Sequence, residues 1–391
     1  PAIHLYPVFR RKSPRTRFQL APNQHPTVDV RGVLTPALGP SIAAQATPHV
    51  EGTGGLYLAE GGGSQKVLLV TARHVLFPPS EGFHVDYART NDSAPRRDVF
   101  LLGTRAYDNL IESIKIAIRK QRIMVELDEQ RIENLQKRLV SQGEDDVEEV
   151  TNRLQETQES LNEAIEAIEA LQKFHDEVKT DWRQVRKRVI GHVVRSPPIT
   201  VGAGTEGFSE DYAIVELDSA RFKKAFKGNV IDLGTKIPLG DFMLMMHPRD
   251  DATTRFIYPA NRLLPLRGVI SEDLMRNPDV LDEDGEASLF VVKNDNTTGV
   301  TIGRATGSFS YGREYFGNNT HRTSKEWAIL PYDGKSGSII VDGRGQIGGL
   351  LTGGAGKTES LDITYATPFF WLFPRIKANG FPNAHLDPEI A

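Results

Sequence analysis

The sequence predicts a mainly β protein that is interrupted by one long antiparallel helical hairpin. Three observations lead to this prediction. Short apolar runs separated by turn residues fill the chain from about residue 50 to 104 and again after residue 189. Gly (35) and Pro (23) are frequent, as expected where turns join many short strands. Residues 105–189 instead almost lack Gly and Pro, and they repeat apolar residues every seven positions.

The overall composition narrows the class of protein. A chain of 391 residues has room for two or three domains. Its net charge of −4 gives no electrostatic reason to expect a nucleic acid or an anionic membrane as partner, and no apolar run approaches the length of a membrane span. The absence of Cys excludes disulfides and thiol nucleophiles. With no signal peptide visible, it favours an intracellular, reducing compartment, although secretion stays open.

The first 49 residues have a different texture from the rest. They are rich in Pro and in basic residues, as in FRRKSPRTRFQLAPNQHP, and they show little periodicity. Such a composition is typical of an extended segment. We therefore expect residues 1–49 to form an extended N-terminal arm that wraps the core or is partly disordered.

The heptad pattern of residues 105–189 comes in two blocks on either side of SQGEDD. The first block has Ile111, Ile118, Val125, Ile132 and Leu139; the second has Val147, Leu154, Leu161, Ile168, His175, Trp182 and Val189. Two such blocks with a polar turn predict an antiparallel coiled-coil hairpin with arms of roughly 50–65 Å. Polar residues at seam positions are expected to fix the register: Gln121, Asp128 and Thr157. The hairpin is either a passive insertion or an arm for a protein partner or self-association.

Strand-like runs return after residue 189. They are VIGHVV, ITVGAG, YAIVELD, FMLMMH, SLFVVK, GVTIGRATGSF, WAILPY, SIIVDG, QIGGLLTGG and DITYATP. Many short strands at close spacing predict a sandwich or a barrel. The segment FFWLFPRIKANG is expected to form a short C-terminal helix that is broken or kinked at Pro374 and ends at Gly380.

Two residues suggest an acid–base pair. His74 follows the apolar run from Val67 to Val70 at the start of a loop, where a strand end would hold its imidazole firmly. Histidine is the side chain best suited to take a proton near neutral pH. Asp211 precedes the alternating run YAIVEL, which would anchor its backbone and leave its carboxylate free to orient a base. A structural His and a strand-capping Asp are the alternatives.

Ser336 is the candidate nucleophile. It lies in Gly334-Lys335-Ser336-Gly337-Ser338, where small neighbours allow a sharp turn that exposes the hydroxyl. The backbone N–H groups of Gly334 and Ser336 could together bind an oxyanion. Taken alone, this motif also fits an ordinary glycine–serine turn.

These segments together resemble the trypsin/chymotrypsin-like serine protease family. The matching segments are TARHV, EDYAIVEL and GKSGSIIVDGRGQIGGLL, in that order. Within the family the likeness is greatest to fungal trypsin-like proteins of unassigned role. His74 and Asp211 are 137 residues apart (211 − 74), and removing the 85 residues of 105–189 leaves 52, an ordinary spacing for this family. One insertion therefore accounts for the unusual spacing.

The resemblance implies two six-stranded β-barrels with the site between them. Residues 50–104 and 190–240 would form the first barrel, 105–189 the inserted hairpin, and 241–391 the second barrel with the C-terminal helix. His74, Asp211 and Ser336 would be catalytic, with an oxyanion hole at Gly334 and Ser336. Leu330 would form the floor of the specificity pocket, and Thr352, Gly353 and Gly354 would pair with an extended peptide substrate. No metal or organic cofactor is implied.

One departure from the family pattern leaves a second function open. The residue before the nucleophile is usually Asp or Asn, but here it is Lys335, and the preceding loop is short. A cation near the histidine would lower its basicity. The alternative to a serine endopeptidase is therefore a catalytically impaired pseudoprotease, in which the barrels are a scaffold and the hairpin recruits a partner.

Overall fold

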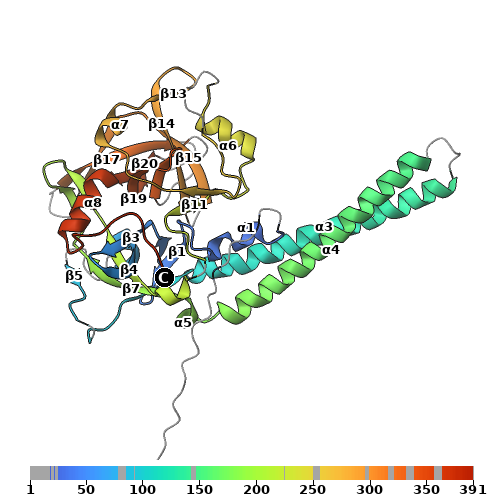
Figure 1. Cartoon of the computed structure of the whole chain (residues 1–391), viewed down its shortest axis with the longest axis horizontal. Helices are drawn as coiled ribbons and strands as arrows, with labels where there is room; N and C mark the ends of the chain where they lie inside the picture. The colour runs from blue at the N-terminus through green and yellow to red at the C-terminus, as the bar shows by residue number, and fades with distance from the viewer. Residues whose placement is uncertain are drawn as a thin grey trace, which may run out of the picture.

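A computed structural model describes the chain except for residues 1–17, 19–21, 23–24, 78–84, 92, 142–146, 224, 250–255, 296–298, 316–320, 332–338, 356–362 and 391. The protein has a mainly β body from which a long helical hairpin projects (Figure 1). No helix in the described part is both long enough and apolar enough to cross a membrane.

The first sheet lies in the N-terminal half of the body. Its strands follow the order β2 (Glu51–Thr53), β1 (Ser41–Ala44), β6 (Asp98–Leu101), β7 (Val189–Ser196), β10 (Ala213–Leu217), β4 (Ser64–Thr71) and β3 (Leu56–Gly61), and β5 (Tyr87–Ala88) pairs with β7. The two end strands β2 and β3 are separated in the chain only by Gly54 and Gly55. The sheet therefore curls round so that one nearly continuous segment supplies both of its edges.

The second sheet contains most of the C-terminal strands. Its order is β13 (Val280–Leu281), β14 (Ala287–Asp295), β18 (Ile339–Asp342), β19 (Ile347–Ala355), β20 (Ile363–Pro368), β17 (His321–Pro331), β9 (Phe208–Glu210) and β8 (Thr200–Ala203). Strand β15 (Gly299–Ala305) pairs with both β14 and β17, and β16 (Phe309–Tyr315) pairs with β17. Antiparallel pairing thus runs in a circuit through β14, β15, β17, β20, β19 and β18 and back to β14.

Smaller elements complete the body. They are α1 (Val28–Arg31), η1 (Gly32–Leu34), α2 (Arg73–Leu76), α5 (Val185–Arg188), η4 (Ser219–Arg221), α6 (Leu239–Met246), α7 (Glu272–Arg276), α8 (Phe369–Ala378) and the pair β11 (Val230–Asp232) and β12 (Leu263–Pro265). A large apolar core extends through both sheets, and a smaller cluster around Trp327 fills the second.

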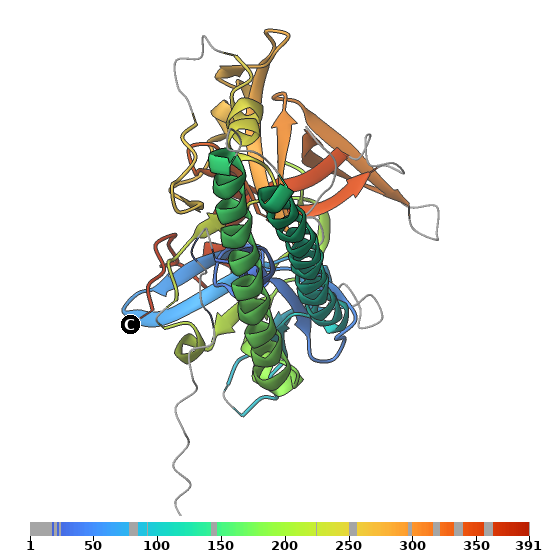
Figure 2. The ribbon, with the colours of Figure 1, turned by 90° about the vertical axis from the view of Figure 1, so that its right-hand side faces the viewer.

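The hairpin consists of α3 (Thr104–Ser141) and α4 (Val147–Asp181), which lie side by side along their length (Figure 2). The chain leaves the first sheet after β6 and returns at β7, two strands that pair directly, with Phe100 opposite Val189. Between the arms, the fully buried carboxylate of Asp128 accepts a 2.7 Å hydrogen bond from Ser160 and a 3.0 Å bond from Arg131. A buried polar contact of this kind fixes the register of two helices.

The half of the hairpin nearest the body is part of the main core. Its buried apolar side chains belong to the same cluster as the sheet residues: Leu110, Ile114, Ile118, Leu171, Phe174, Val178 and Trp182. Phe18 lies between Trp182 and Phe222, with ring centroids 5.6 and 4.7 Å away. Arg31 also pairs with Glu177 at 2.9 Å and lies over the ring of Phe174. The inner half of the hairpin is therefore anchored, whereas its outer half extends into solvent (Figure 1).

Several expected boundaries need correction. The N-terminal segment is not an arm throughout, because β1 is a buried strand of the first sheet. It has four residues and is buried on both faces, so it shows no alternating pattern. Strands β8 and β9 fall in the range expected for the first barrel but belong to the second sheet. The helices stop at Asp181 and Arg188, so Val189 begins a strand instead of extending the heptads.

One local expectation was wrong, and another is confirmed in part. The run FMLMMH was expected to be a strand but lies in helix α6, where Phe242 and Met246, four residues apart, are buried together. A short apolar run fits either structure, and here the tertiary contacts decide. The expected C-terminal helix is present as α8, and it ends at Ala378, shortly before Gly380 with its φ of +115°. The helix is not broken at Pro374, because it continues through that residue.

Candidate active site

The pairing of two strands brings His74 and Asp211 together. The last residue of β4, Thr71, is opposite Ala213, the first residue of β10. His74 lies three residues after Thr71 in the short helix α2, and Asp211 lies two residues before Ala213. Residues 137 positions apart in the sequence therefore become neighbours at one end of the first sheet.

The Asp211 carboxylate holds His74 through two contacts. Its Oδ2 lies 2.6 Å from His74 Nδ1, and its Oδ1 accepts a hydrogen bond of 3.2 Å from the His74 backbone N–H. Asp211 is buried, with 8% of its side chain exposed, whereas 45% of the His74 side chain is exposed. When neutral His74 donates from Nδ1 to this carboxylate, the lone pair lies on Nε2. The pair therefore sets the tautomer needed for a base at Nε2.

The acid also changes the proton affinity of the histidine. Partial burial lowers the pKa of His74, but the hydrogen bond to Asp211 and the negative charge of that carboxylate together outweigh this effect. The pKa of His74 is therefore raised above its usual value of 6.5. A raised pKa stabilises the imidazolium that forms when His74 accepts a proton.

Asp211 lies where the chain passes from one sheet to the other. The residues just before it belong to β9 in the second sheet, and those just after it to β10 in the first. Glu210 forms an ion pair with Arg375 of α8, and the Ser209 carbonyl accepts a 2.7 Å hydrogen bond from Thr367. These contacts from the second sheet and α8 fix the backbone that presents the carboxylate.

Arg73, the residue before His74, braces the same helix from inside. It is 1% exposed, and its guanidinium donates to the backbone carbonyls of Ser196 at 2.9 Å and Val85 at 2.7 Å. Burial lowers the pKa of Arg73, while the negative charge of Asp211 opposes that change. No sequence pattern indicated this role, because an arginine after a strand is ordinarily exposed.

A second buried carboxylate lies beside Asp211. Glu326 of β17 is 6% exposed and accepts a 2.5 Å hydrogen bond from Ser209 Oγ, and its Oε2 lies 3.4 Å from Thr352 Oγ1. Burial raises the pKa of Glu326, the hydroxyl contacts oppose this, and the charge of Asp211 adds to it. Glu326 therefore connects Thr352, an expected substrate-binding residue, with the segment that carries Asp211. Sequence reasoning missed Glu326, because a Glu in a strand usually faces solvent.

The other expected substrate-binding residues lie on the strand that carries Glu326 and on β19. Leu330 is near the end of β17 and is 38% exposed. Gly353 and Gly354 of β19 pair with β20, the strand that separates them from β17. A Cβ atom built on Gly353 would meet no atom of the described residues within 4 Å, so these residues leave open space beside the backbone there.

The expected nucleophile and oxyanion hole lie outside the described residues. Ser336, Gly334 and Lys335 all fall in 332–338, between the end of β17 at Pro331 and the start of β18 at Ile339. The structure thus brings together His74 and Asp211, and Glu326 links Thr352 to the segment that carries Asp211. Ser336 remains a sequence-based assignment.

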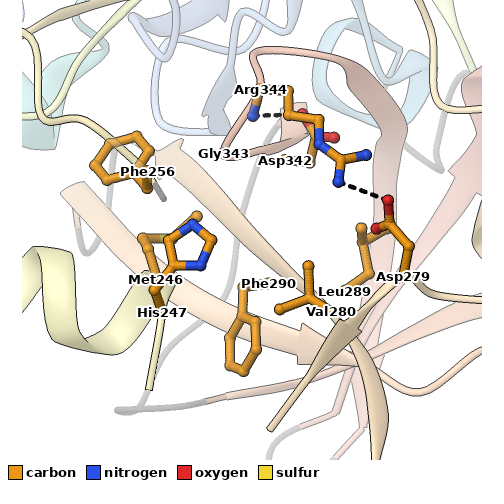
Figure 3. A pocket seen from close by; sticks show the side chains of 10 residues that line it. All are labelled: Met246, His247, Phe256, Asp279, Val280, Leu289, Phe290, Asp342, Gly343 and Arg344. Carbon is orange, nitrogen blue, oxygen red and sulfur yellow. Dashed lines mark hydrogen bonds and ion pairs between the residues drawn. The ribbon is translucent and has the colours of Figure 1, made fainter. Parts of the chain in front are cut away.

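A small cavity elsewhere in the second sheet does not belong to this site. It has a volume of about 60 Å³ and lies between α6, β14 and the turn that joins β18 to β19 (Figure 3). Arg344 at this turn pairs with Asp279 at 2.6 Å, and its backbone N–H donates to Asp342. Such a volume holds on the order of two water molecules. None of its lining residues is an expected site residue, and we assign it no function.

Comparisons with known proteins give weak similarities. No known protein family and no curated protein matches the sequence. Thermobifida fusca Protease A and a Nocardiopsis protease are each 10% identical, with 90% of this chain and 98% of theirs covered and a TM-score of 0.36. A glutamic acid specific serine protease that uses a histidine triad in substrate binding is 10% identical, with 87% and 97% covered and a TM-score of 0.35. These neighbours are trypsin/chymotrypsin-like serine proteases.

Proposed function

We propose that this chain is a serine endopeptidase with two six-stranded β-barrels of trypsin-like type. The observation that carries the proposal is the contact of His74 with Asp211, at 2.6 Å, in which the histidine is half exposed and the acid is buried. A base used on an external substrate must reach solvent, and the acid that orients it works best when shielded. The circuit of β-pairing in the second sheet and the curled first sheet support the barrel interpretation.

The chemistry would run through a covalent acyl-enzyme. Ser336 Oγ attacks the scissile carbonyl carbon while His74 Nε2 takes the hydroxyl proton, and Asp211 stabilises the resulting imidazolium. The backbone N–H groups of Gly334 and Ser336 bind the oxyanion. His74 then gives its proton to the leaving amine, and the C–N bond breaks. Water, deprotonated by His74, attacks the acyl-enzyme and releases the carboxylate product and Ser336.

Substrate recognition would use the edge of β19. Thr352, Gly353 and Gly354 would offer backbone hydrogen bonds to an extended peptide, as in recognition by strand addition. The open space around Gly353 supports this, because a side chain there would narrow the approach to the backbone. An apolar floor at Leu330 would favour an apolar substrate side chain.

The test is cleavage of a mixture of synthetic peptides of varied sequence, followed by mass spectrometry. Wild-type protein should cut a defined subset of bonds. Both Ser336→Ala and His74→Ala should lose this cleavage while keeping the wild-type circular dichroism spectrum. An exposed histidine outside the proposed site provides the matched control, and His49→Ala should retain the cleavage. Cleavage that persists in both site variants would assign it to a contaminant and contradict the proposal.

The pseudoprotease alternative keeps the same scaffold without the chemistry. Lys335 and the long hairpin favour it, because a cation beside the nucleophile opposes protonation of His74 and the hairpin offers a surface for a partner. A well-folded wild-type protein that cuts no peptide in the mixture would support this alternative.

A further inference from the structure

The outer face of α3 carries apolar side chains that no part of the described chain covers. Ile116, Ile123 and Leu127 are 44%, 55% and 42% exposed. At 100° per residue they lie within about 40° of one another around the helix, on the side opposite to buried Ile114 and Asp128. Met124, 39% exposed, flanks them. We call these four residues the outer stripe.

Charged residues along one flank of the outer stripe change sign in a regular order. Between residues 112 and 137 they are, from the N-terminal end, Glu112, Lys115, Arg119, Arg122, Glu126, Glu129, Glu133 and Lys137. All are exposed. The signs therefore run −, +, +, +, −, −, −, +. Reading the row backwards inverts every sign, so the row is complementary to itself in the antiparallel direction.

We propose that the outer stripe of α3 binds the same surface of a second copy of this chain, with the two α3 helices antiparallel about a two-fold axis near Met124. In this arrangement residues whose numbers add up to 248 or 249 face each other. Every facing pair along the flank then has opposite charges: Glu112 with Lys137, Lys115 with Glu133, Arg119 with Glu129, and Arg122 with Glu126.

The apolar part of the contact lies at the two-fold axis. Ile123 of one copy lies beside Ile123 of the other, and Leu127 of each copy lies beside Ile123 of its partner. This is the self-complementary contact that a two-fold interface requires. A parallel arrangement would place this row against the opposite flank of the partner helix, so the row would not meet its own complement. The charge pattern therefore selects the antiparallel orientation and a second copy as the occupant.

The interface is small, so the dimer should be weak. The overlap from residue 112 to 137 spans about 38 Å, and a helix is about 10 Å wide, which gives roughly 400 Å² per copy. Stable interfaces bury about 800 Å² per partner. Within one chain, Glu112 contacts Lys115 at 3.3 Å and Arg119 at 2.6 Å. Such exposed pairs contribute little and can exchange with pairs across the interface. We therefore expect a dimer that dissociates readily on dilution.

The first experiment is sedimentation velocity over a range of protein concentrations. The wild-type chain should shift reversibly from monomer to dimer, and the dimer should weaken between low and high NaCl because exposed charges are screened. Ile123→Asp with Leu127→Asp should weaken the dimer at least tenfold. Ile165→Asp, on an exposed position of α4, is the matched control and should leave it unchanged. A chain that stays monomeric, or a dimer that persists in the double variant, would overturn the proposal.

A charge exchange tests the orientation. The variant Arg119→Glu with Arg122→Glu has a uniformly acidic central row, and Glu126→Arg with Glu129→Arg has a uniformly basic one. Each variant alone should be monomeric, and an equal mixture of the two should form dimers. Unchanged circular dichroism would show that the hairpin remains folded. Dimers of either variant alone, or no dimers in the mixture, would contradict antiparallel pairing.

Distances between spin labels give an independent test of geometry. The chain has no Cys, so Met124→Cys and Lys137→Cys each provide one labelling site. Antiparallel packing about residue 124 places the two copies of residue 124 side by side and the two copies of residue 137 about 39 Å apart. Parallel packing would make both distances short and would refute the proposed arrangement.

Discussion

Replacing Asp211 by Asn tests the acid–base pair with almost no change in shape. The oxygen of the new amide can still accept the hydrogen bond from the His74 backbone N–H, which is 3.2 Å in the native protein. The amide NH₂ would then face His74 Nδ1, which is 2.6 Å from the native carboxylate oxygen. Because an amide donates where a carboxylate accepts, the imidazole would carry its proton on Nε2 instead of Nδ1. The variant keeps the geometry and removes the base.

The expected loss is large. An incorrect tautomer in a serine–histidine–aspartate site lowers kcat by about 10⁴-fold, which corresponds to about 5 kcal/mol of transition-state stabilisation. The assay is hydrolysis of the best peptide found in the cleavage screen. Asp218→Asn, an exposed carboxylate paired with Arg221 after β10, is the matched control and should change kcat/KM little. A loss smaller than tenfold for Asp211→Asn would refute the role of the pair.

The same variant should change the pH dependence. Because Asp211 raises the pKa of His74, protonated His74 stabilises the native state. This stabilisation is fully present below about pH 6.5 and is lost as the pH rises through the folded-state pKa. In the proposed mechanism neutral His74 is the active form, so activity should rise over that same range. In Asp211→Asn the pKa of His74, measured by NMR, should fall. An unchanged pKa would show that the carboxylate does not control the imidazole.

Three further predictions concern residues around the site and in the hairpin. Because burial raises the pKa of Glu326, ionisation of this carboxyl group destabilises the fold above pH 4.5. Glu326→Gln should therefore raise the free energy of unfolding, relative to wild type, at about pH 8 but not at about pH 4. An equal change at both pH values in urea titrations would contradict this. Ser160→Ala removes one hydrogen bond to the buried Asp128 carboxylate and should destabilise the outer hairpin by about 1–3 kcal/mol. Hydrogen exchange of the backbone amides in the outer hairpin measures this loss, and unaltered exchange would argue against the buried contact. Replacing residues 122–166 by a short turn should keep the melting temperature within a few degrees of wild type. Removing residues 105–187 should lower it strongly, because the inner half of the hairpin lies in the core. Equal melting temperatures of the two deletion variants would disprove that anchoring.

The helical hairpin and the strand before His74 were predicted correctly because each leaves a repeating pattern of apolar residues in the sequence. The heptads predicted a helical hairpin, and the structure has α3 and α4 in that region. The run from Val67 to Val70 predicted a buried strand that ends near His74, and β4 ends at Thr71. Both patterns depend on neighbours in the sequence. Such neighbours determine the exposed and buried faces of an element before any tertiary contact forms.

The features that the sequence did not predict depend on distant contacts. Strand β9 joins the second sheet by a parallel pairing of Phe208 with Lys325, which no local pattern reveals. Helix α6 contains a run of apolar residues that a strand would also accommodate. The roles of Arg73 and Glu326 arise because charged residues are buried by strands remote in the sequence. Composition marks such residues as surface residues, so only the fold shows their role.

The most direct measurement of the central claim is to identify the residue that a fluorophosphonate modifies. Purified protein would be treated with diisopropyl fluorophosphate, digested, and analysed by tandem mass spectrometry, in parallel with His74→Ala. An active site built from His74, Asp211 and Ser336 predicts one adduct, on Ser336, and its loss in His74→Ala. No adduct on the well-folded wild-type protein, or an adduct that forms equally in His74→Ala, would contradict an activated serine at this site.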